Sequence, residues 1–492
     1  MTASPIIISI VSVYILILLV IGIWGRKEST DVAGYYVAGK KLPAWIIAFS
    51  SNATGESAWL LLGLTGMSYL VGFHALWIVM GEVLGVTLAW VLVARPFKKA
   101  TDHFGSITVP DYLEDRFEDR AHVLRILSAV IILSMAAFYI AAQLTAAGKA
   151  FESFLGTSYE VGVLIGTAIV LYYTTVGGLK AVAYSDLLQG ILMVLCLLIL
   201  PVIGIKTAGG WANMIDTLRS QDPALLEPLG SLGFSPAGIA SVLGFLGIGL
   251  AFLGAPHLLT RFIAARDEDS IVDGSLIAVP CMVVFQLGAV FSGIAGRAIF
   301  PGLEDPETVY PLMGTELFPE VFTGIFLVVV LAAIMSTADS LLLLASSAVV
   351  RDVIQKTLNL EWSERLLSRW GKVTTLVIGA FALAFALPEI RVIFWFVLFA
   401  WSGLASAFTP VVLCALFWRG TTKMGAIAGM AAGFTTTVIW VLVFKSRFYD
   451  LYEMIPGFIA GFTAIFGVSL LTRPQPEVLG LEQPGPTAFP KR

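Results

Sequence analysis

The chain has 492 residues, of which 58% are hydrophobic and 13% are charged, and its mean hydropathy is +0.88. A soluble globular protein carries about twice that share of charged residues, so the composition excludes a soluble enzyme and indicates an integral membrane protein. With a formal net charge of −4 and no basic cluster, the chain lacks the electrostatic signature of a nucleic-acid-binding protein.

The residues that most often bind metals or form disulfides are few and scattered. Cys196, Cys281 and Cys414 are isolated within apolar runs, and the four histidines show no ligand spacing. No phosphate-binding glycine loop is present. The sequence therefore predicts no organic cofactor and disfavours an ATP-driven or metal-dependent membrane enzyme. The first apolar segment lacks a basic leader and a cleavage site, so we interpret it as a retained helix.

A membrane-spanning helix needs about 20 apolar residues, and thirteen such segments follow one another along the chain. They lie near residues 5–24, 42–71, 73–94, 123–149, 160–177, 184–206, 236–258, 272–299, 319–348, 371–388, 392–418, 424–444 and 451–471. We expect one all-α transporter domain over residues 1–472 and a flexible cytoplasmic tail at 473–492, which is rich in proline.

Lysine and arginine are enriched in cytoplasmic loops, which gives the orientation. If the N-terminus is outside, only seven of the 30 basic residues fall on the outer side: Lys149, Lys206, Arg219, Arg297, Arg391, Lys445 and Arg447. The sequence therefore predicts an external N-terminus and a cytoplasmic C-terminus. The polar loop 95–122 is expected to form a short amphipathic piece at the cytoplasmic surface, and 207–235 and 300–318 are the longer outer loops.

The predicted helix at 42–71 is interrupted at its centre by the polar stretch SSNATGES at 50–57, which contains Glu56. A carboxylate within the membrane is costly and is by default a functional candidate. A helix break at mid-depth is tolerated only where the free backbone faces protein or a wet cavity, and such breaks form ion and substrate sites in transporters. The alternative is a polar kink packed against a neighbouring helix.

The predicted helix at 236–258 is also interrupted, by Gly244, Gly247, Gly249 and Gly254 and then Pro256. Glycines also allow close helix packing, so this helix alone is weak evidence. Two broken helices that lie five spans apart and enter from opposite sides, however, fit an inverted repeat of five helices. We expect the repeats at about 42–206 and 236–418.

The segment LAAIMSTADSLLLL contains a hydroxyl-bearing helical face formed by Ala333, Ser336, Thr337 and Ser340. Hydroxyl and carbonyl oxygens suit a hard cation such as Na⁺. The alternative is that these hydroxyls bond back to their own helix. Asp339 in the same run favours a cation site, because a buried carboxylate needs a partner.

Further polar residues have two interpretations each. Asp186 either caps its helix or joins Asp339 and Ser340 in a second cation site. Tyr139 and Gln143 lie four residues apart, and they either face a central cavity or pack as ordinary helix residues. The buried acids Glu56 and Glu82 are candidates for sharing a proton or an ion.

Six motifs together make the chain resemble the sodium/solute symporter family, and within it most closely the bacterial sodium/proline symporters. They are SSNATGESAWLLLGLTG, VPDYLEDRF, TTVGGLKAVAYSDLLQG, GAPHLLTRFIAA, AAIMSTADSLLL and FAWSGLASAFTPVVL. The resemblance implies a LeuT-type fold of about thirteen helices in the bacterial inner membrane. It also implies Na⁺-driven import, by alternating access, of a small organic solute such as proline or a related amino acid. The implied partners are this solute and the lipid bilayer, with no nucleic acid and no obligate protein partner.

The resemblance also implies site residues. The main sodium site would use the carbonyls of Ala53, Glu56 and Ala333 and the hydroxyls of Ser336 and Thr337. A second sodium site, found in some members, would map to Asp186, Ser336, Asp339 and Ser340. The substrate site would comprise Gly55, Ser57, Tyr139, Ile248, Phe252 and Pro256, to which the helix spacing adds Gln143.

Three positions depart from the proline symporters. This chain has Gly55 where they have an aspartate, Ile248 where they have a tryptophan, and Phe252 where they have a tyrosine. Another small organic acid as substrate and H⁺ as the coupling ion therefore remain alternatives. A transporter-like sensor module is a third alternative, because the transporter module of this family also occurs fused to signalling domains.

Overall fold

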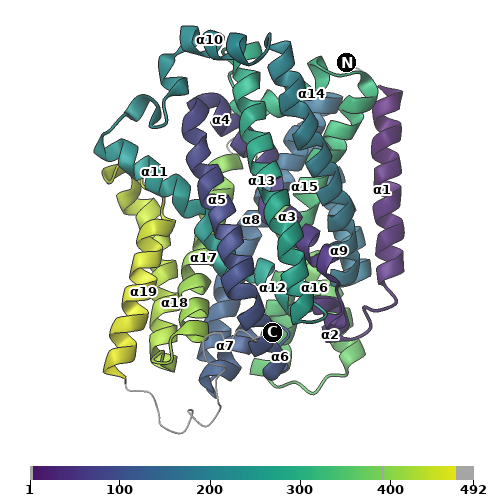
Figure 1. Cartoon of the computed structure of the whole chain (residues 1–492). Helices are drawn as coiled ribbons and strands as arrows, with labels where there is room; N and C mark the ends of the chain where they lie inside the picture. The colour runs from purple at the N-terminus through teal and green to yellow at the C-terminus, as the bar shows by residue number, and fades with distance from the viewer. Residues whose placement is uncertain (1–3, 389–392, 473–492) are drawn as a thin grey trace, which may run out of the picture.

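The computed structural model describes residues 4–388 and 393–472, and within them the chain forms helices almost throughout (Figure 1). In the described part of the chain, the strand-like pairing is one isolated bridge between Leu42 and Ala265. The predicted all-α class is confirmed. The predicted tail at 473–492 lies outside the described residues.

The α-helices are numbered in chain order. They are α1 (Pro5–Gly25), α2 (Val32–Val37), α3 (Ala44–Ala58), α4 (Thr65–Val71), α5 (Leu76–Leu88), α6 (Arg95–His103), α7 (Val109–Phe117), α8 (Val123–Leu155), α9 (Tyr159–Thr207), α10 (Trp211–Gln221), α11 (Pro236–Ile248), α12 (Pro256–Ala264), α13 (Glu268–Ile299), α14 (Val309–Glu316), α15 (Glu320–Ser347), α16 (Glu364–Ala386), α17 (Ile393–Phe417), α18 (Lys423–Ile439) and α19 (Met454–Leu471).

Eleven helical segments of the described residues are long and apolar enough to cross a membrane. Two of them, Ala44–His103 with 60 residues and Tyr159–Thr207 with 49, are far longer than the roughly 20 residues that one crossing needs. Each contains a glycine with a positive φ, Gly72 in the first and Gly178 in the second, where the helical course is broken. Two crossings in each would give thirteen, but the count itself stays a prediction.

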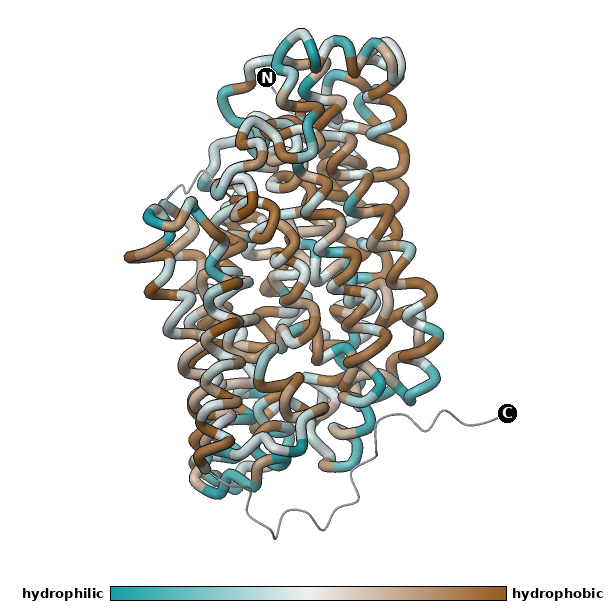
Figure 2. The backbone as a smooth tube through the Cα atoms, turned by 60° about the vertical axis from the view of Figure 1, so that its left-hand side comes forward, coloured by the Kyte–Doolittle hydropathy of each residue, from teal (hydrophilic) through white to brown (hydrophobic). Residues whose placement is uncertain are grey.

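Apolar side chains cover the outside of the bundle as well as its core. Leu16, Val20, Val202 and Leu442 are all more than half exposed, which suits contact with lipid. Figure 2 shows hydrophobic residues along the length of the helices and hydrophilic residues gathered at the two ends. The helices α15 and α17 are the most buried of the candidate spans, whereas α1 and α18 are largely peripheral.

The structure corrects the predicted end of the helix at 236–258. The chain continues past α11 through a tight turn at Gly249–Leu253 and starts a second half-helix, α12, which ends at Ala264. Pro256 occupies the first turn of α12, where a missing N–H costs nothing and the fixed φ favours the helix.

The predicted loops also contain helices. The segment 95–122 forms α6 and α7, and the predicted outer loops contain α10 and α14. In Figure 1, α10 and α14 lie at the end of the bundle where α1 starts, and α6 and α7 lie at the opposite end, where α19 finishes.

Candidate functional site

The break in the first half of the chain lies at Ser57, near the end of α3. Ser57 has φ 57° and ψ −172°, a conformation that strains a residue with a side chain. Side-chain acceptors contact two backbone N–H groups at the break. The Ala58 N–H donates to Gln143 Oε1 at 3.0 Å, and the Trp59 N–H donates to Ser57 Oγ at 3.1 Å. Gln143 and Ser57, two predicted site residues, therefore meet at the break.

A second break, between α11 and α12, faces the first. A β-carbon added to Gly55 of α3 would lie 2.7 Å from Cε1 of Phe252 in the turn Gly249–Leu253. At the start of that turn, the carbonyl of Ile248 accepts a hydrogen bond from Trp401 Nε1 of α17 at 3.0 Å. The two broken helices are thus in direct contact, and the predicted residues Gly55, Ile248 and Phe252 all lie at this junction.

Aromatic rings surround the junction. The ring centroid of Trp401 lies 5.2 Å from that of Phe252 and 5.6 Å from that of His257, and the rings of Tyr139 and His257 are 6.2 Å apart. His257, which directly follows Pro256, is fully buried, and neither ring nitrogen has a hydrogen-bond partner among the described residues. The junction is therefore an aromatic environment with few polar groups. Neither His257 nor Trp401 was among the predicted site residues.

The hydroxyl face of α15 lies directly against α3. Ser336 Oγ donates to the carbonyl of Ala53 at 2.8 Å and to that of Ala333 at 3.1 Å. Thr337 Oγ1 donates to the carbonyl of Thr54 at 2.8 Å. All of these residues are fully buried. The structure therefore brings four of the five predicted sodium-binding residues, Ala53, Ala333, Ser336 and Thr337, into one group of neutral oxygens, and their role as ligands stays a prediction.

Glu56 is predicted as the fifth ligand through its carbonyl oxygen, and this stays a prediction; its side chain points away from the hydroxyl face. Its carboxylate Oε2 accepts a hydrogen bond at 2.8 Å from Gln286 Nε2 of α13, and its carbonyl accepts the Trp59 N–H. Its side chain therefore contacts α13, while the hydroxyl face belongs to α15. Gln286 was not predicted, because nothing in the sequence shows which helix Glu56 faces. The predicted sharing of a proton or an ion with Glu82 stays a prediction.

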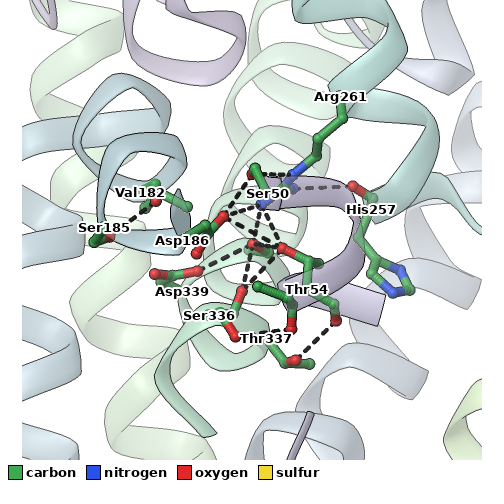
Figure 3. A network of polar contacts seen from close by, with 12 residues as sticks. Ser50, Thr54, Val182, Ser185, Asp186, His257, Arg261, Ser336, Thr337 and Asp339 are labelled. Carbon is green, nitrogen blue, oxygen red and sulfur yellow. Dashed lines mark hydrogen bonds and ion pairs between the residues drawn. The ribbon is translucent and has the colours of Figure 1, made fainter. Parts of the chain in front are cut away.

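The residues of the predicted second cation site also converge, but around Arg261, which lies between the predicted helices 236–258 and 272–299 (Figure 3). Asp186 Oδ2 lies 3.3 Å from Nη2 of Arg261 and accepts a hydrogen bond from Ser50 Oγ at 2.6 Å. Asp339 Oδ2 accepts from Tyr173 at 2.6 Å, and its Oδ1 accepts from Ser340 at 3.0 Å. Arg261 also donates to Ser340 Oγ.

Arg261 was missed because the predicted helix ended three residues before it. Its side chain is 1% exposed and projects from the second half-helix, α12, into the bundle. The signal that could have found it is its position four residues after His257 in an otherwise apolar run, which places both residues on one face of a short helix.

A separate ionic cluster lies near α7. Arg125 of α8 is 2% exposed and pairs with Asp111 at 2.6 Å, with Glu114 at 2.7 Å and with Asp352 at 2.8 Å. Arg351 pairs with Asp111 at 3.0 Å. Burial alone would raise the pKa of Asp111, but the charges of Arg351 and Arg125 outweigh it and hold that pKa below its ordinary value. The cluster fastens α7 to α8 and to the end of the α15 segment.

Comparisons with known proteins agree with this architecture. The high-affinity proline transporter PutP of Bacillus subtilis is 36% identical over 461 residues, covering 93% of this chain and 96% of that protein. The osmoregulated proline transporter OpuE of the same organism is 32% identical over 468 residues, covering 94% of each. A sodium/proline symporter of Staphylococcus aureus is 32% identical over 477 residues, covering 94% of this chain and 92% of that protein.

Two solved structures of lower identity share the fold. A Na⁺-coupled sialic acid symporter in a substrate-bound, outward-open state has a TM-score of 0.80 and 18% identity, covering 96% of this chain and 99% of its own. MhsT in complex with L-phenylalanine has a TM-score of 0.53 and 14% identity, covering 87% and 98%. These similarities confirm the predicted LeuT-type class. The relatives are transporters, which are not enzymes.

A family model described as the sodium:solute symporter family matches residues 35–433. This match spans both helix breaks and the hydroxyl face, and the relatives named above extend over nearly the whole chain. The protein is therefore a multi-pass membrane protein that belongs to the sodium:solute symporter family.

Proposed function

We propose that the protein is a Na⁺-coupled symporter that imports proline or a closely related amino acid across the bacterial plasma membrane by alternating access. The observation that carries this proposal is the contact between the broken helix α3 and the hydroxyl face of α15. There Ser336 and Thr337 donate to the carbonyls of Ala53 and Thr54. The family and the proline transporters among its relatives supply the substrate class.

A sodium ion would bind at this contact through the carbonyls of Ala53, Glu56 and Ala333 and the hydroxyls of Ser336 and Thr337. Because its ligands come from two helices, the ion would fix α3 relative to α15. That arrangement would hold the neighbouring break at Ser57 in the geometry that binds substrate. Coupling between two ligands is reciprocal, so substrate should also tighten Na⁺ binding.

The substrate would bind where the two breaks meet. Tyr139, Phe252 and Trp401 would pack against its apolar part, and polar groups of the interrupted helices would orient its charged ends. Ile248 is smaller than the tryptophan of proline symporters, and Phe252 lacks the hydroxyl of their tyrosine. We therefore expect this protein to differ from them mainly in its selectivity among small amino acids.

Uptake in proteoliposomes would test the proposal directly. Purified protein is reconstituted, and radiolabelled proline uptake is measured under an inward Na⁺ gradient, an equal K⁺ gradient and a proton gradient. We expect accumulation with Na⁺ alone, and competition by unlabelled proline above other amino acids. Proton-driven accumulation would replace Na⁺ by H⁺ as the coupling ion. Stronger competition by a different organic acid would replace proline as the substrate. No gradient-driven uptake at all would favour a sensor.

We also propose the orientation and the repeats. The N-terminus lies outside and the C-terminus in the cytoplasm, supported by the basic residues near α6 and α7, and residues 42–206 and 236–418 form two inverted halves. Reporter fusions at the C-terminus test the orientation: a fluorescent protein that matures only in the cytoplasm should be bright, and alkaline phosphatase should be inactive.

A further inference from the structure

We propose that one anionic phospholipid binds on α9 between α1 and α16, with its phosphate group held by Arg26 and Lys372. The site faces the surrounding bilayer at the end of the bundle where α1 finishes. It goes beyond the proposed transport function and does not rest on it, because none of its residues belongs to the proposed ion or substrate sites.

Lys372 of α16 differs from the other lysines that are shielded from water. Among the described residues, each of the other buried or half-buried lysines pairs with a carboxylate, namely Lys40, Lys98, Lys149, Lys180, Lys423 and Lys445. Lys372 is also half-buried, but its ammonium group lies 5.8 Å from the ring centroid of Tyr35 and pairs with no carboxylate in the described part of the chain. A ring face attracts a cation without neutralising it. Because a partly desolvated charge without a counterion is unfavourable, this position favours an anion from outside the chain.

Arg26 adds a second positive charge at the same place. It directly follows α1, it is exposed, and it lies close enough to Lys372 for the two charges to repel each other. Within residues 4–388 and 393–472, no ion pair neutralises Arg26. A phosphate group fits both side chains, because arginine binds it through two parallel N–H groups and lysine binds it as a point charge.

The basic surface continues along α16. Arg365, Arg369 and Lys372 are four and three residues apart, so they lie on one face of the helix, and both arginines are exposed. Leu376 continues the same face toward the middle of the membrane and is exposed as well. A helix face that is basic for two turns and then apolar matches the head group and the acyl chains of an anionic lipid.

Three acidic residues near this surface are directed to other partners. Glu364 Oε2 accepts the Val32 N–H at 3.1 Å, Asp31 Oδ1 accepts the Gly34 N–H at 2.6 Å, and Glu28 pairs with Lys180. Their charges are therefore not available to Arg26 and Lys372.

The surface below the two cations is open to acyl chains. On α9, Tyr173 packs against Gly22 of α1, and Leu171 packs against Gly379 of α16. Successive residues of a helix point about 100° apart, so Tyr172 projects between these two contacts. Tyr172 is 43% exposed, and α1 lies at the edge of the bundle (Figure 1). A lipid lying over Tyr172 would therefore contact all three helices.

Two exposed tryptophans give the depth of the site in the membrane. Trp24 lies two residues before Arg26, and Trp370 lies two residues before Lys372. Tryptophan is enriched at the membrane–water interface, where lipid head groups lie. The two cations are therefore at the depth at which a phospholipid carries its phosphate.

The test is a lipid titration followed by native mass spectrometry. Purified full-length protein is stripped of lipid in detergent and titrated with phosphatidylglycerol, or with phosphatidylcholine of the same acyl chains. Thermal unfolding is measured with each lipid and with inorganic phosphate. The variants are Arg26→Gln, Lys372→Gln, the double variant and Lys372→Arg. Lys99→Gln is the matched control, because Lys99 is an exposed lysine of α6 at the same end of the bundle.

We expect the wild type to retain one phosphatidylglycerol more tightly than phosphatidylcholine, and its Tm to rise with phosphatidylglycerol only. Each loss of a charge should weaken phosphatidylglycerol binding about fivefold, and the double variant should weaken it about 25-fold. Lys372→Arg and Lys99→Gln should bind like the wild type. If Lys372→Gln does not fold, Arg26→Gln decides alone, because Arg26 is exposed.

Three results would overturn the proposal. Equal affinity for the two lipids would remove the role of charge, and unchanged binding by the double variant would place the lipid elsewhere. Equal stabilisation by inorganic phosphate would assign the cations to a free anion. Because the titration needs no transport, absence of Na⁺-driven proline uptake would refute the proposed function and leave this result intact.

Discussion

Gly55 and Phe252 contact each other across the junction of the two broken helices, and a β-carbon at position 55 would lie 2.7 Å from Phe252 Cε1. Both positions depart from the proline symporters that the sequence resembles. Because the two residues are in contact, the departures are structurally linked: the ring of Phe252 occupies the space that a side chain at position 55 would need.

Gly55→Ala should therefore disturb the junction. Overpacking of this kind costs about 1–3 kcal/mol, and we expect a lower Tm and reduced proline uptake. Adding Phe252→Leu should restore much of both. The control is Gly467→Ala in α19, where an added β-carbon meets nothing within 4 Å. A double variant no better than Gly55→Ala would show that the two positions are not linked.

Removing the hydroxyl groups of α15 should weaken the sodium dependence. Ser336→Ala and Thr337→Val each remove one proposed ligand, and we expect the half-saturating Na⁺ concentration for uptake to rise about tenfold, equivalent to about 1.4 kcal/mol. Thr337→Ser keeps the hydroxyl and should stay close to the wild type. Ser347→Ala is the control, because that hydroxyl bonds to its own helix at Leu344. An unchanged sodium dependence in both variants would remove this face from the site.

Glu56→Gln should leave Na⁺-coupled uptake largely intact. The carboxylate faces Gln286, and both Glu56 Oε1 and Gln286 Oε1 lack a partner among the described residues. An amide at position 56 could accept from Gln286 Nε2 and donate to Gln286 Oε1, so the contact would survive. Glu56→Leu would leave the buried Gln286 amide unsatisfied, at a cost of about 1–3 kcal/mol in stability. Loss of sodium dependence in Glu56→Gln would instead make the carboxylate a cation ligand.

Acid should loosen the ionic cluster around Arg125. Since the folded-state pKa of Asp111 lies below its ordinary value of about 3.9, its ionised form stabilises the fold above that pH. This contribution is lost as the pH falls through the folded-state pKa. We expect the Tm, measured in detergent, to fall progressively as the pH is lowered below about 5.

Asp111→Asn provides the control for that titration. It should lower Tm at neutral pH, because breaking a buried ion pair by removing one partner costs about 3–5 kcal/mol, and it should flatten the acid dependence. An acid profile identical to that of the wild type would assign the pH effect to other groups.

The sequence predicted those parts of the site that depend on local patterns. The polar interruption at 50–57 and the helical spacing of Ser336 and Thr337 are visible along the chain, and the structure brings these segments together. Arg261 and Gln286 were missed because their roles depend on contacts more than 200 residues away in sequence, with Ser50 and Glu56 respectively. The predicted helix at 236–258 also stopped short of Arg261, which lies in α12.

The break at Ser57 has a thermodynamic consequence for coupling. A side chain of α8, Gln143, substitutes for the missing backbone acceptor of Ala58, so the protein itself maintains the interruption. The free energy of ion binding is then not consumed in unwinding a helix. It remains available to shift the population between outward-facing and inward-facing states, and the size of that shift is set by how differently the two states bind the ion.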